Sequence, residues 1–378
     1  MRKGFTITQF IIAQFFVMCT FFVGKQIYYA LNKNLGYKKD AILIIETPWQ
    51  NQSMQVQYFF KEKLKQISLI GQVSMGLDAP ASENNNITKA SYNAGGHETN
   101  VDVLIKSGDE NYTKIYDLKI LSGRNLTIAD TIGGVLINTK LAHELGVKNY
   151  VNAIGKEINV EGGRCSVIGV IADFYQSSLH DPIKPLIIST RGGQYSNRIF
   201  HIALKSQSGN NDWNKAIVGI QAAWKQAYPE YDFEYRFFDD SISHFYEGEH
   251  KIIKLLNWAT GLSIFISCLG LLGLTIYTTN QRRKEISIRK VMGATTIQLM
   301  VMLSKQQLML ILIAFFIAVP FAWMAMNKWV QSFNDRTAIS LWIFAISGGC
   351  VLIIGLIVSG YQTLRAAMVT PSINLRAE

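Results

Sequence analysis

Four long stretches without a charged residue constrain the fold of this chain more than any other feature. They are Gly4–Gly24, Leu255–Gln281, Gln306–Asn327 and roughly Thr337–Leu364. A helix of about 20 apolar residues crosses the hydrocarbon core of a bilayer, where only a helix or a closed barrel satisfies the backbone. The sequence therefore predicts four transmembrane helices. The first stretch is not followed by a small-residue cleavage site, so we expect an uncleaved anchor rather than a signal peptide.

The segment between the first two stretches has the composition of a water-exposed domain. Residues 32–254 contain 24 Lys/Arg and 24 Asp/Glu, although the whole chain carries a formal net charge of +10. This length is sufficient for a domain with its own core. Because Cys165 is the only one of the four cysteines outside the apolar stretches, no disulfide is expected to stabilise that domain.

The excess positive charge lies on one side of the predicted spans. If the spans alternate in direction, most of the Lys/Arg outside residues 32–254 fall on one side of the membrane. Glu285 and Glu378 are the only acids on that side. The other side carries only Lys25, Lys328 and Arg336 as cations. Such a bias marks the cytoplasmic side, so we expect both termini in the cytoplasm and the domain outside it. A neutral domain argues against nucleic-acid binding.

A short charged segment, residues 282–296, links the second and third stretches. Its charged residues are Arg282, Arg283, Lys284, Glu285, Arg289 and Lys290. The apolar residues Ile286, Ile288, Val291 and Met292 alternate with them, so the segment can lie along the membrane surface as a helix. Two interpretations stay open. The segment is either a topology signal alone, or it receives a push from a soluble partner and transmits it to both spans.

The water-exposed domain alternates strand-like and helix-like segments, which predicts a mixed α+β fold. The expected strands are Ala41–Glu46, Val135–Asn138, Ile158–Val160, Cys165–Ile171 and Phe233–Phe238. The expected helices are Gln52–Ile67, Thr139–Leu145 and Asp212–Ala227. Residues 79–100 are rich in Asn, Ser, Ala and Gly and are expected to form an exposed loop or an insertion.

The second span is expected to continue outside the membrane as a stalk. Ser241–Lys254 leads into it without a proline or a turn signal, and Lys25–Asn34 is the expected partner. Within the spans, Gly270, Gly273 and Gly355 offer small faces for helix packing. Pro320 is expected to kink the third span, either as a hinge or as a tolerated membrane proline. The absence of charged residues from the spans argues against ion-coupled transport.

No sequence pattern supports catalysis. The chain contains no phosphate-binding G-x-x-x-x-G-K-[ST] loop, no H-E-x-x-H zinc motif and no G-x-S-x-G elbow. His244, Glu247 and His250 have a spacing that metal ligands can have, but a solvated face of the stalk is the favoured interpretation. Asp173, Ser178 and His180 lie too close in one loop to favour a catalytic triad. We predict no catalytic residue, no cofactor site and no metal site.

Several segments resemble one known family of membrane proteins. Ile264–Leu274, Gln281–Ala294, Pro320–Trp323 and Asn327–Phe333 resemble the FtsX-like permeases of ABC transporters. Segments of the water-exposed domain resemble the MacB-type periplasmic core domain, namely Val135–Asn138, Ala153–Lys156, Val167–Phe174, Ser178–Pro185 and Phe237–Ser241. The pattern is closest to the second half of double-length permeases of Bacteroidetes-type bacteria. The chain is then either a four-span subunit or a separated half.

The resemblance implies a non-catalytic subunit that pairs with a separate cytoplasmic P-loop ATPase and works as a homodimer or with a similar half. The ATPase would move a coupling helix at 282–296, and the movement would reach the periplasmic domain, a mode called mechanotransmission. The residues that would face or orient the ATPase are Arg282, Arg283, Glu285, Arg289, Lys290, Gly293 and Ala294. Gly293 and Ala294 would allow the turn into the next span.

The expected architecture is an α-helical inner-membrane protein with a mixed α+β periplasmic domain inserted between helix 1 and helix 2. Its parts are residues 1–35 (first span and stalk), 36–245 (periplasmic domain) and 246–378 (stalk and three spans). The expected function is export or extraction of a substrate under ATPase control, in contact with membrane lipid and with a periplasmic protein or lipoprotein. The alternative is a regulator that recruits or activates a periplasmic partner such as a cell-wall hydrolase.

Overall fold

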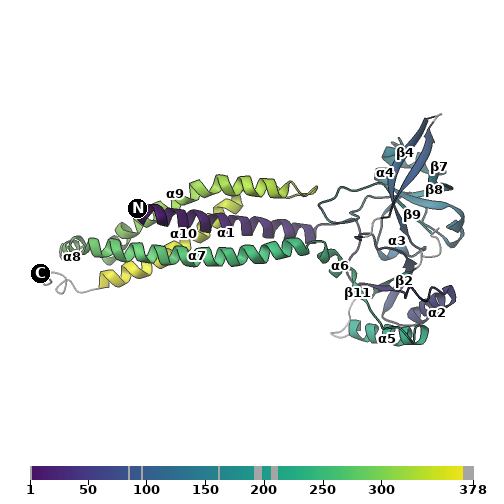
Figure 1. Ribbon diagram of the computed structural model, residues 1–378, viewed down its shortest axis with the longest axis horizontal. Helices are drawn as coiled ribbons and strands as arrows, with labels where there is room; N and C mark the ends of the chain where they lie inside the picture. The colour runs from purple at the N-terminus through teal and green to yellow at the C-terminus, as the bar shows by residue number, and fades with distance from the viewer. Residues whose placement is uncertain are drawn as a thin grey trace. The chain divides into compact units, whose positions relative to one another are not determined.

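The chain divides into two compact units, which are described separately (Figure 1). The computed structural model describes residues 2–83, 86–94, 97–160, 162–190, 198–205 and 212–368. The helical unit comprises Met1–Ala30 and Glu247–Glu378, and the α+β unit comprises Leu31–Tyr246.

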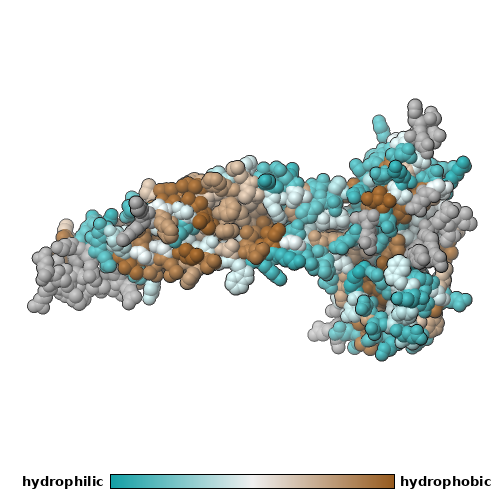
Figure 2. Space-filling model, viewed as in Figure 1, coloured by the Kyte–Doolittle hydropathy of each residue, from teal (hydrophilic) through white to brown (hydrophobic). Residues whose placement is uncertain are grey.

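The helical unit contains four helices that are long and apolar enough to cross a membrane. They are α1 (Arg2–Asn32), α7 (Glu247–Gln281), α9 (Thr296–Val330) and α10 (Leu341–Met368). A short helix, α8 (Arg283–Val291), links α7 to α9. Apolar side chains cover much of the surface of this unit in Figure 2, as expected for helices that face lipid.

Small residues let the helices of this unit approach closely. Ala318 and Ala322 of α9 are fully buried in one cluster with Met18 and Phe22 of α1. Lipid gives no hydrophobic drive for helix association, so close packing of small residues is the main source of stability there.

A polar contact ties α1 to the loop between α9 and α10. The buried Gln26 Oε1 accepts hydrogen bonds from the backbone N–H and the hydroxyl of Thr337, both at 2.9 Å. Tyr29 donates to Asp335 Oδ1 at 3.0 Å. The amide of Gln26 therefore has partners at both of its ends, since its Nε2 also donates to the Asp335 carbonyl at 3.3 Å.

The α+β unit contains an antiparallel four-stranded sheet in the order β11-β1-β10-β2. Its strands are β1 (Ile42–Glu46), β2 (Ile70–Gly76), β10 (Ile199–Leu204) and β11 (Arg236–Phe237). Helices α2 (Met54–Lys65) and α5 (Asp212–Ala227) pack against each other and bury the core beside this sheet. Phe60 lies at its centre, with its ring centroid 5.0 Å from that of Phe200 and 5.4 Å from that of Trp224.

The second sheet closes on itself. Its order is β5-β8-β6-β9-β4-β3-β7, and β7 also pairs with β8, so six of the seven strands form a ring. The strands are β3 (Ile87–Ala94), β4 (His97–Ser107), β5 (Ile120–Gly123), β6 (Gly134–Asn138), β7 (Glu157–Val160), β8 (Gly163–Ile171) and β9 (Leu186–Ser189). Helix α4 (Thr139–Glu144) contributes Leu141 and Ala142 to the core of this sheet. The closure leaves few unpaired strand edges.

Three expectations from the sequence were wrong in this unit. Most of residues 79–100 is not a loop, because β3 pairs with β4 along its whole length from Ile87 to Ala94. The predicted strand Phe233–Phe238 shrinks to two residues, since Phe238 begins helix α6 (Phe238–His244). The expected stalk helix over Ser241–Lys254 is not continuous: α7 extends the span back to Glu247, but Phe245 and the buried Tyr246 separate it from α6.

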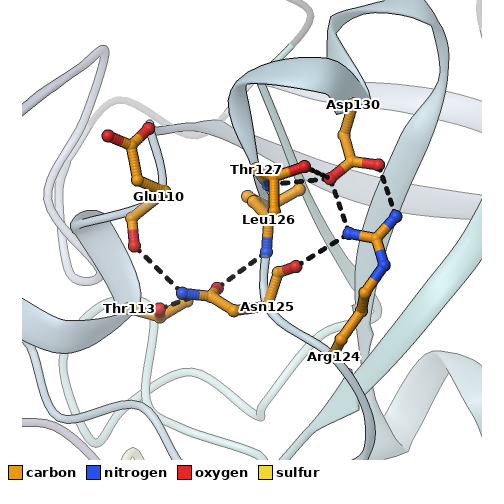
Figure 3. Close-up of polar contacts among 7 residues, drawn as sticks. All are labelled: Glu110, Thr113, Arg124, Asn125, Leu126, Thr127 and Asp130. Atoms are coloured by element: carbon orange, nitrogen blue, oxygen red, sulfur yellow. Dashed lines mark hydrogen bonds and ion pairs between the residues drawn. The ribbon is translucent and has the colours of Figure 1, made fainter.

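An ion pair fixes the segment that precedes β6 (Figure 3). Both terminal nitrogens of Arg124 lie 2.7 Å from the carboxylate oxygens of Asp130. Asp130 also accepts from the backbone N–H and the hydroxyl of Thr127, both at 2.7 Å. The Arg124 guanidinium, followed by the Thr127 donors, holds the pKa of Asp130 well below its usual range. Asn125 donates a hydrogen bond to the Glu110 carbonyl and accepts one from the Thr113 hydroxyl, which connects the segment held by the Arg124–Asp130 ion pair to α3 (Tyr112–Ile115).

We predict that Asp130→Asn lowers the stability of the α+β unit by about 2 kcal/mol at neutral pH, because charge-assisted hydrogen bonds are lost. The loss is no larger because the Arg124 side chain is half exposed and its charge is screened by water. A carboxylate with a lowered pKa stabilises the fold above its ordinary pKa of about 4 and loses that effect as the pH falls. Thermal unfolding of the detergent-solubilised chain should show a difference from wild type at pH 7 that narrows below pH 4. Asp102→Asn, an exposed carboxylate on β4, is the control and should show no difference.

Candidate functional site

The charged link predicted from the sequence forms helix α8 and the turn that follows it. Glu285 and Arg289 form an ion pair at 2.9 Å along the helix, with both side chains about half exposed. Such a pair at i,i+4 stabilises a surface helix by only a few tenths of a kcal/mol. Its contribution to stability is therefore small, and both charges remain available to a partner.

Two sides of α8 differ in what they contact. Ile286 is buried against Leu299 and Leu303 of α9. In contrast, Ile288, Val291 and Met292 are exposed by 54%, 70% and 80%. Ile288 and Val291 have the i, i+3 spacing of one helix face, and Met292 is the residue directly after α8. The link thus presents a contiguous apolar face beside its charges while Ile286 attaches it to the next helix.

Gly293 makes the turn from α8 into α9. Its φ of 93° lies in the left-handed region, which favours glycine. The N–H of Ala294 donates to the Arg289 carbonyl at 3.0 Å, a hydrogen bond typical of a glycine-terminated helix. Thr295 then caps α9 in a reciprocal box with Gln298. The turn is therefore short and defined at both ends.

The remaining predicted residues are dispersed. Arg282 lies between α7 and α8 and lines a small cleft. The side chains of Arg283 and Lys290 lie outside the described residues, although both backbones belong to α8.

The predicted packing residues have different surroundings. A Cβ on Gly270 would lie 2.1 Å from Gln9 of α1, and one on Gly355 would lie 2.4 Å from Ile311 of α9. Gly273 has open space beside it, so it makes no close helix contact. Helix α9 continues through Pro320, and its role as a hinge stays a prediction.

A second cluster, which the sequence did not indicate, lies in the α+β unit where the chain enters and leaves it. Tyr37 packs against Phe174 at 6.0 Å and against Phe238 at 5.5 Å between ring centroids. Phe238 in turn contacts Tyr116 at 5.2 Å, and Tyr116 hydrogen bonds to His201 Nδ1 at 2.7 Å. These rings connect both chain ends of the unit to β10 of the four-stranded sheet. The aromatic residues are far apart in sequence, so no local pattern could have grouped them.

Buried ionisable groups surround this cluster. Burial lowers the pKa of His201 to about 3, a shift that the carboxylate of Asp109 opposes. Burial also lowers the pKa of Lys106 to about 8, although Asp78 favours its charged form. Asp109 accepts from Lys61 at 2.7 Å and from Ser74 at 2.6 Å, which ties the segment before α3 to α2 and to β2 of the four-stranded sheet. Among the described residues, no group of three or more His, Cys, Asp or Glu could hold a metal ion.

Comparisons with known proteins identify the family. A model of the MacB-like periplasmic core domain matches residues 5–220, more than half of the chain, and a model of the FtsX-like permease C-terminal region matches residues 257–371. The chain belongs to the MacB/FtsX-like family of ABC transporter permeases. The predicted resemblance to FtsX-like permeases and to the MacB-type periplasmic core domain is therefore confirmed.

Individual relatives of this permease are distant. YknZ of Bacillus subtilis (strain 168), an ABC transporter permease, is 23% identical over 235 residues, which cover 60% of this chain and 58% of YknZ. The periplasmic region of MacB from Actinobacillus actinomycetemcomitans is 16% identical with a TM-score of 0.39, covering 57% of this chain and 97% of that one. The extracellular domain of YknZ from Gram-positive bacteria is 16% identical with a TM-score of 0.37, covering 52% and 97%. The family therefore rests on the sequence models.

We predict that Gly293→Ala weakens the end of α8 in this permease by about 1 kcal/mol, because alanine is strained at positive φ. Hydrogen exchange of residues 283–292 should accelerate about fivefold. Gly248→Ala is the matched control, since Gly248 lies within α7 with open space beside it and should tolerate a methyl group. Equal exchange in both variants would contradict a strained turn at Gly293.

A second prediction concerns the stability of the α+β unit at acidic pH. A histidine whose folded pKa lies below its unfolded value of about 6.5 destabilises the fold as the pH falls, since only the unfolded chain takes up the proton. His201 should therefore cost stability progressively between pH 6.5 and 3. His201→Asn should flatten the fall of the melting temperature over this range, whereas His143→Asn, at an exposed position, should not. An unchanged slope in His201→Asn would contradict a neutral buried histidine.

Proposed function

We propose that this chain is the membrane subunit of a mechanotransmission-type ABC transporter, in which a separate ATPase moves α8 and the movement reaches the α+β unit. The proposal includes an inner-membrane location with α8 in the cytoplasm and the α+β unit in the periplasm. It rests mainly on the exposed face of α8, where Ile288, Val291 and Met292 lie beside the Glu285–Arg289 pair. An exposed apolar face flanked by charges is typical of a protein interface.

The connections of α8 support a mechanical role. Ile286 packs on Leu299 and Leu303, and the turn at Gly293 is fixed by hydrogen bonds. A force on the exposed face would therefore displace α7 and α9 instead of only bending the link. The apolar stretches 4–24, 255–281, 306–327 and 337–364 contain no charged residue that would indicate an ion pathway, which favours movement over conduction.

The aromatic cluster of the α+β unit supports the part of the proposal in which movement of the chain ends passes into this unit. Tyr37 follows α1 in the chain and Phe238 precedes α7, and their rings are 5.5 Å apart. Protein cores are close-packed and change arrangement as units. A displacement of either chain end would therefore reach Tyr116 and, through its hydrogen bond, His201 on β10 of the four-stranded sheet.

The expected cargo is a substrate that is exported or extracted from the membrane, and the expected assembly is a homodimer or a pair with a similar half. The alternative function is control of a periplasmic partner, and an exposed Asn/Ser-rich loop at 79–100 would favour it. Much of that segment is the β3–β4 hairpin, so this observation no longer favours the alternative.

The test is stimulation of the ATPase that co-purifies with the tagged chain from its native membrane. We predict that Met292→Asp reduces stimulation at least tenfold, since a charge would be buried in the apolar interface. The double exchange Glu285→Arg with Arg289→Glu keeps the intrahelical pair but reverses the charges that face the partner, and should also abolish stimulation. Lys328→Gln, at the other end of α9, is the control.

Three results would contradict this assignment. The first is the absence of any co-purifying P-loop ATPase. The second is full stimulation by Met292→Asp, which would remove the exposed face from the interface. The third is full stimulation by the charge exchange, which would reduce the Glu285–Arg289 pair to a helix-stabilising contact.

A further inference from the structure

A small cleft lies between α7 and α9 at the end of the helical unit that carries α8. It is lined by Leu274, Thr278, Arg282, Leu303, Gln306 and Gln307, and it has room for one water-sized group, about 10 Å³. Three kinds of polar group therefore meet at a boundary between two spans: a guanidinium, two amides and a hydroxyl. The cleft is too small for a whole ligand, so any ligand must insert one small group and leave the rest outside.

Two of these side chains have unused hydrogen-bonding capacity. Gln307 is 97% buried, and its Nε2 donates to Thr275 at 2.7 Å, but its Oε1 has no partner among the described residues. A buried acceptor without a partner costs stability unless a donor reaches it. Arg282 is exposed and forms no ion pair with any described carboxylate, because Glu285 pairs with Arg289 instead. The cleft thus offers a cation at its mouth, and one of its lining side chains, Gln307, carries a fully buried acceptor without a partner among the described residues.

The exposed aromatic residues of α7 place Arg282 at the depth of lipid headgroups. Trp258 is exposed by 81% and Tyr277 by 46%, and they lie about 28 Å apart along the helix at 1.5 Å per residue. Tryptophan and tyrosine gather at the two interfaces of a bilayer whose hydrocarbon core is about 30 Å thick. Arg282 follows Tyr277 by about 7 Å, which is outside the hydrocarbon and within the headgroup layer.

We propose that this cleft binds the headgroup of a phospholipid, with Arg282 holding the phosphate and Gln307 accepting a hydrogen bond from a donor of the same headgroup once its side chain turns to bring the buried Oε1 to the cleft. An arginine binds a phosphate through two parallel charge-assisted hydrogen bonds. An ionised phosphate cannot donate to Gln307 Oε1, so the inserted group must be an ammonium or a hydroxyl. The primary ammonium of phosphatidylethanolamine has the size of a water molecule and meets this requirement. Phosphatidylcholine has no donor and does not.

This assignment separates Arg282 from the residues that face the ATPase. Arg282 lies outside α8, beside the cleft, whereas Glu285 and Arg289 lie within α8. The lipid site needs only the membrane location of the helical unit, and it does not depend on an ATPase. A failure of ATPase coupling would therefore leave it intact.

The experiment measures phospholipid bound to the full chain after exchange into mild detergent, by native mass spectrometry with added phosphatidylethanolamine, phosphatidylglycerol or phosphatidylcholine. We predict that the wild-type chain binds phosphatidylethanolamine at least fivefold more tightly than phosphatidylcholine. Arg282→Gln should weaken phosphatidylethanolamine binding at least tenfold. Arg282→Lys keeps the charge but loses the two parallel donors of the guanidinium, so its affinity should lie between those of wild type and Arg282→Gln. Gln307→Leu should remove the preference over phosphatidylcholine. Lys305→Gln, an exposed cation next to the cleft residues on α9, should have no effect.

Several outcomes would overturn the proposal. If Arg282→Gln binds phosphatidylethanolamine as tightly as wild type, Arg282 does not hold the phosphate. If Lys305→Gln loses as much affinity as Arg282→Gln, the binding reflects general charge attraction. Equal binding of phosphatidylcholine by the wild type would remove the Gln307 contact. Release of the lipid by millimolar inorganic phosphate would assign the cleft to a free anion. Tight binding of phosphatidylglycerol would, in contrast, support the proposal, with a hydroxyl as the donor to Gln307. A size-exclusion profile like that of wild type shows for each variant that the fold is retained.

Discussion

The absence of water from the hydrocarbon core is the constraint on which the rest of this structure depends. A span in lipid must satisfy its own backbone and cannot hold an unpaired charge, so α1, α7, α9 and α10 are helical and uncharged along their apolar windows. Polar chemistry is therefore confined to the ends of the helical unit and to the α+β unit. Gln26 and Thr337 satisfy each other at one end, and the link with Arg282 and α8 lies at the other.

The contrast between these two ends has a physical meaning. Around Gln26 every amide atom has a partner, whereas at the α8 end Gln307 keeps an unpartnered oxygen. Fully satisfied polar networks specify one arrangement, and partly satisfied ones leave room for another partner. The α8 end is accordingly where we assign both an ATPase contact and a lipid contact, on different residues.

The sequence predicted well those elements whose signal is local. The four spans follow from charge-free length, and α5 over Asp212–Ala227 follows from helical spacing. The link was also found by its charges and its glycine. What the sequence did not reveal depends on distant pairing: β3 is a strand because β4 and β7 pair with it, despite its Asn- and Ser-rich surroundings. The contact of Tyr116 with His201, and the unpartnered oxygen of Gln307, likewise arise only when separate elements meet.

The adjacency of Tyr37 and Phe238 has an evolutionary consequence. Because the two ends of the α+β unit meet within one aromatic contact of 5.5 Å, the unit occupies a single narrow insertion point in the chain. A domain attached in this way can be lost, enlarged or exchanged without altering the spacing of the helices that flank it. The α+β unit of this chain could therefore change in length or content while the helical unit and its link stay the same.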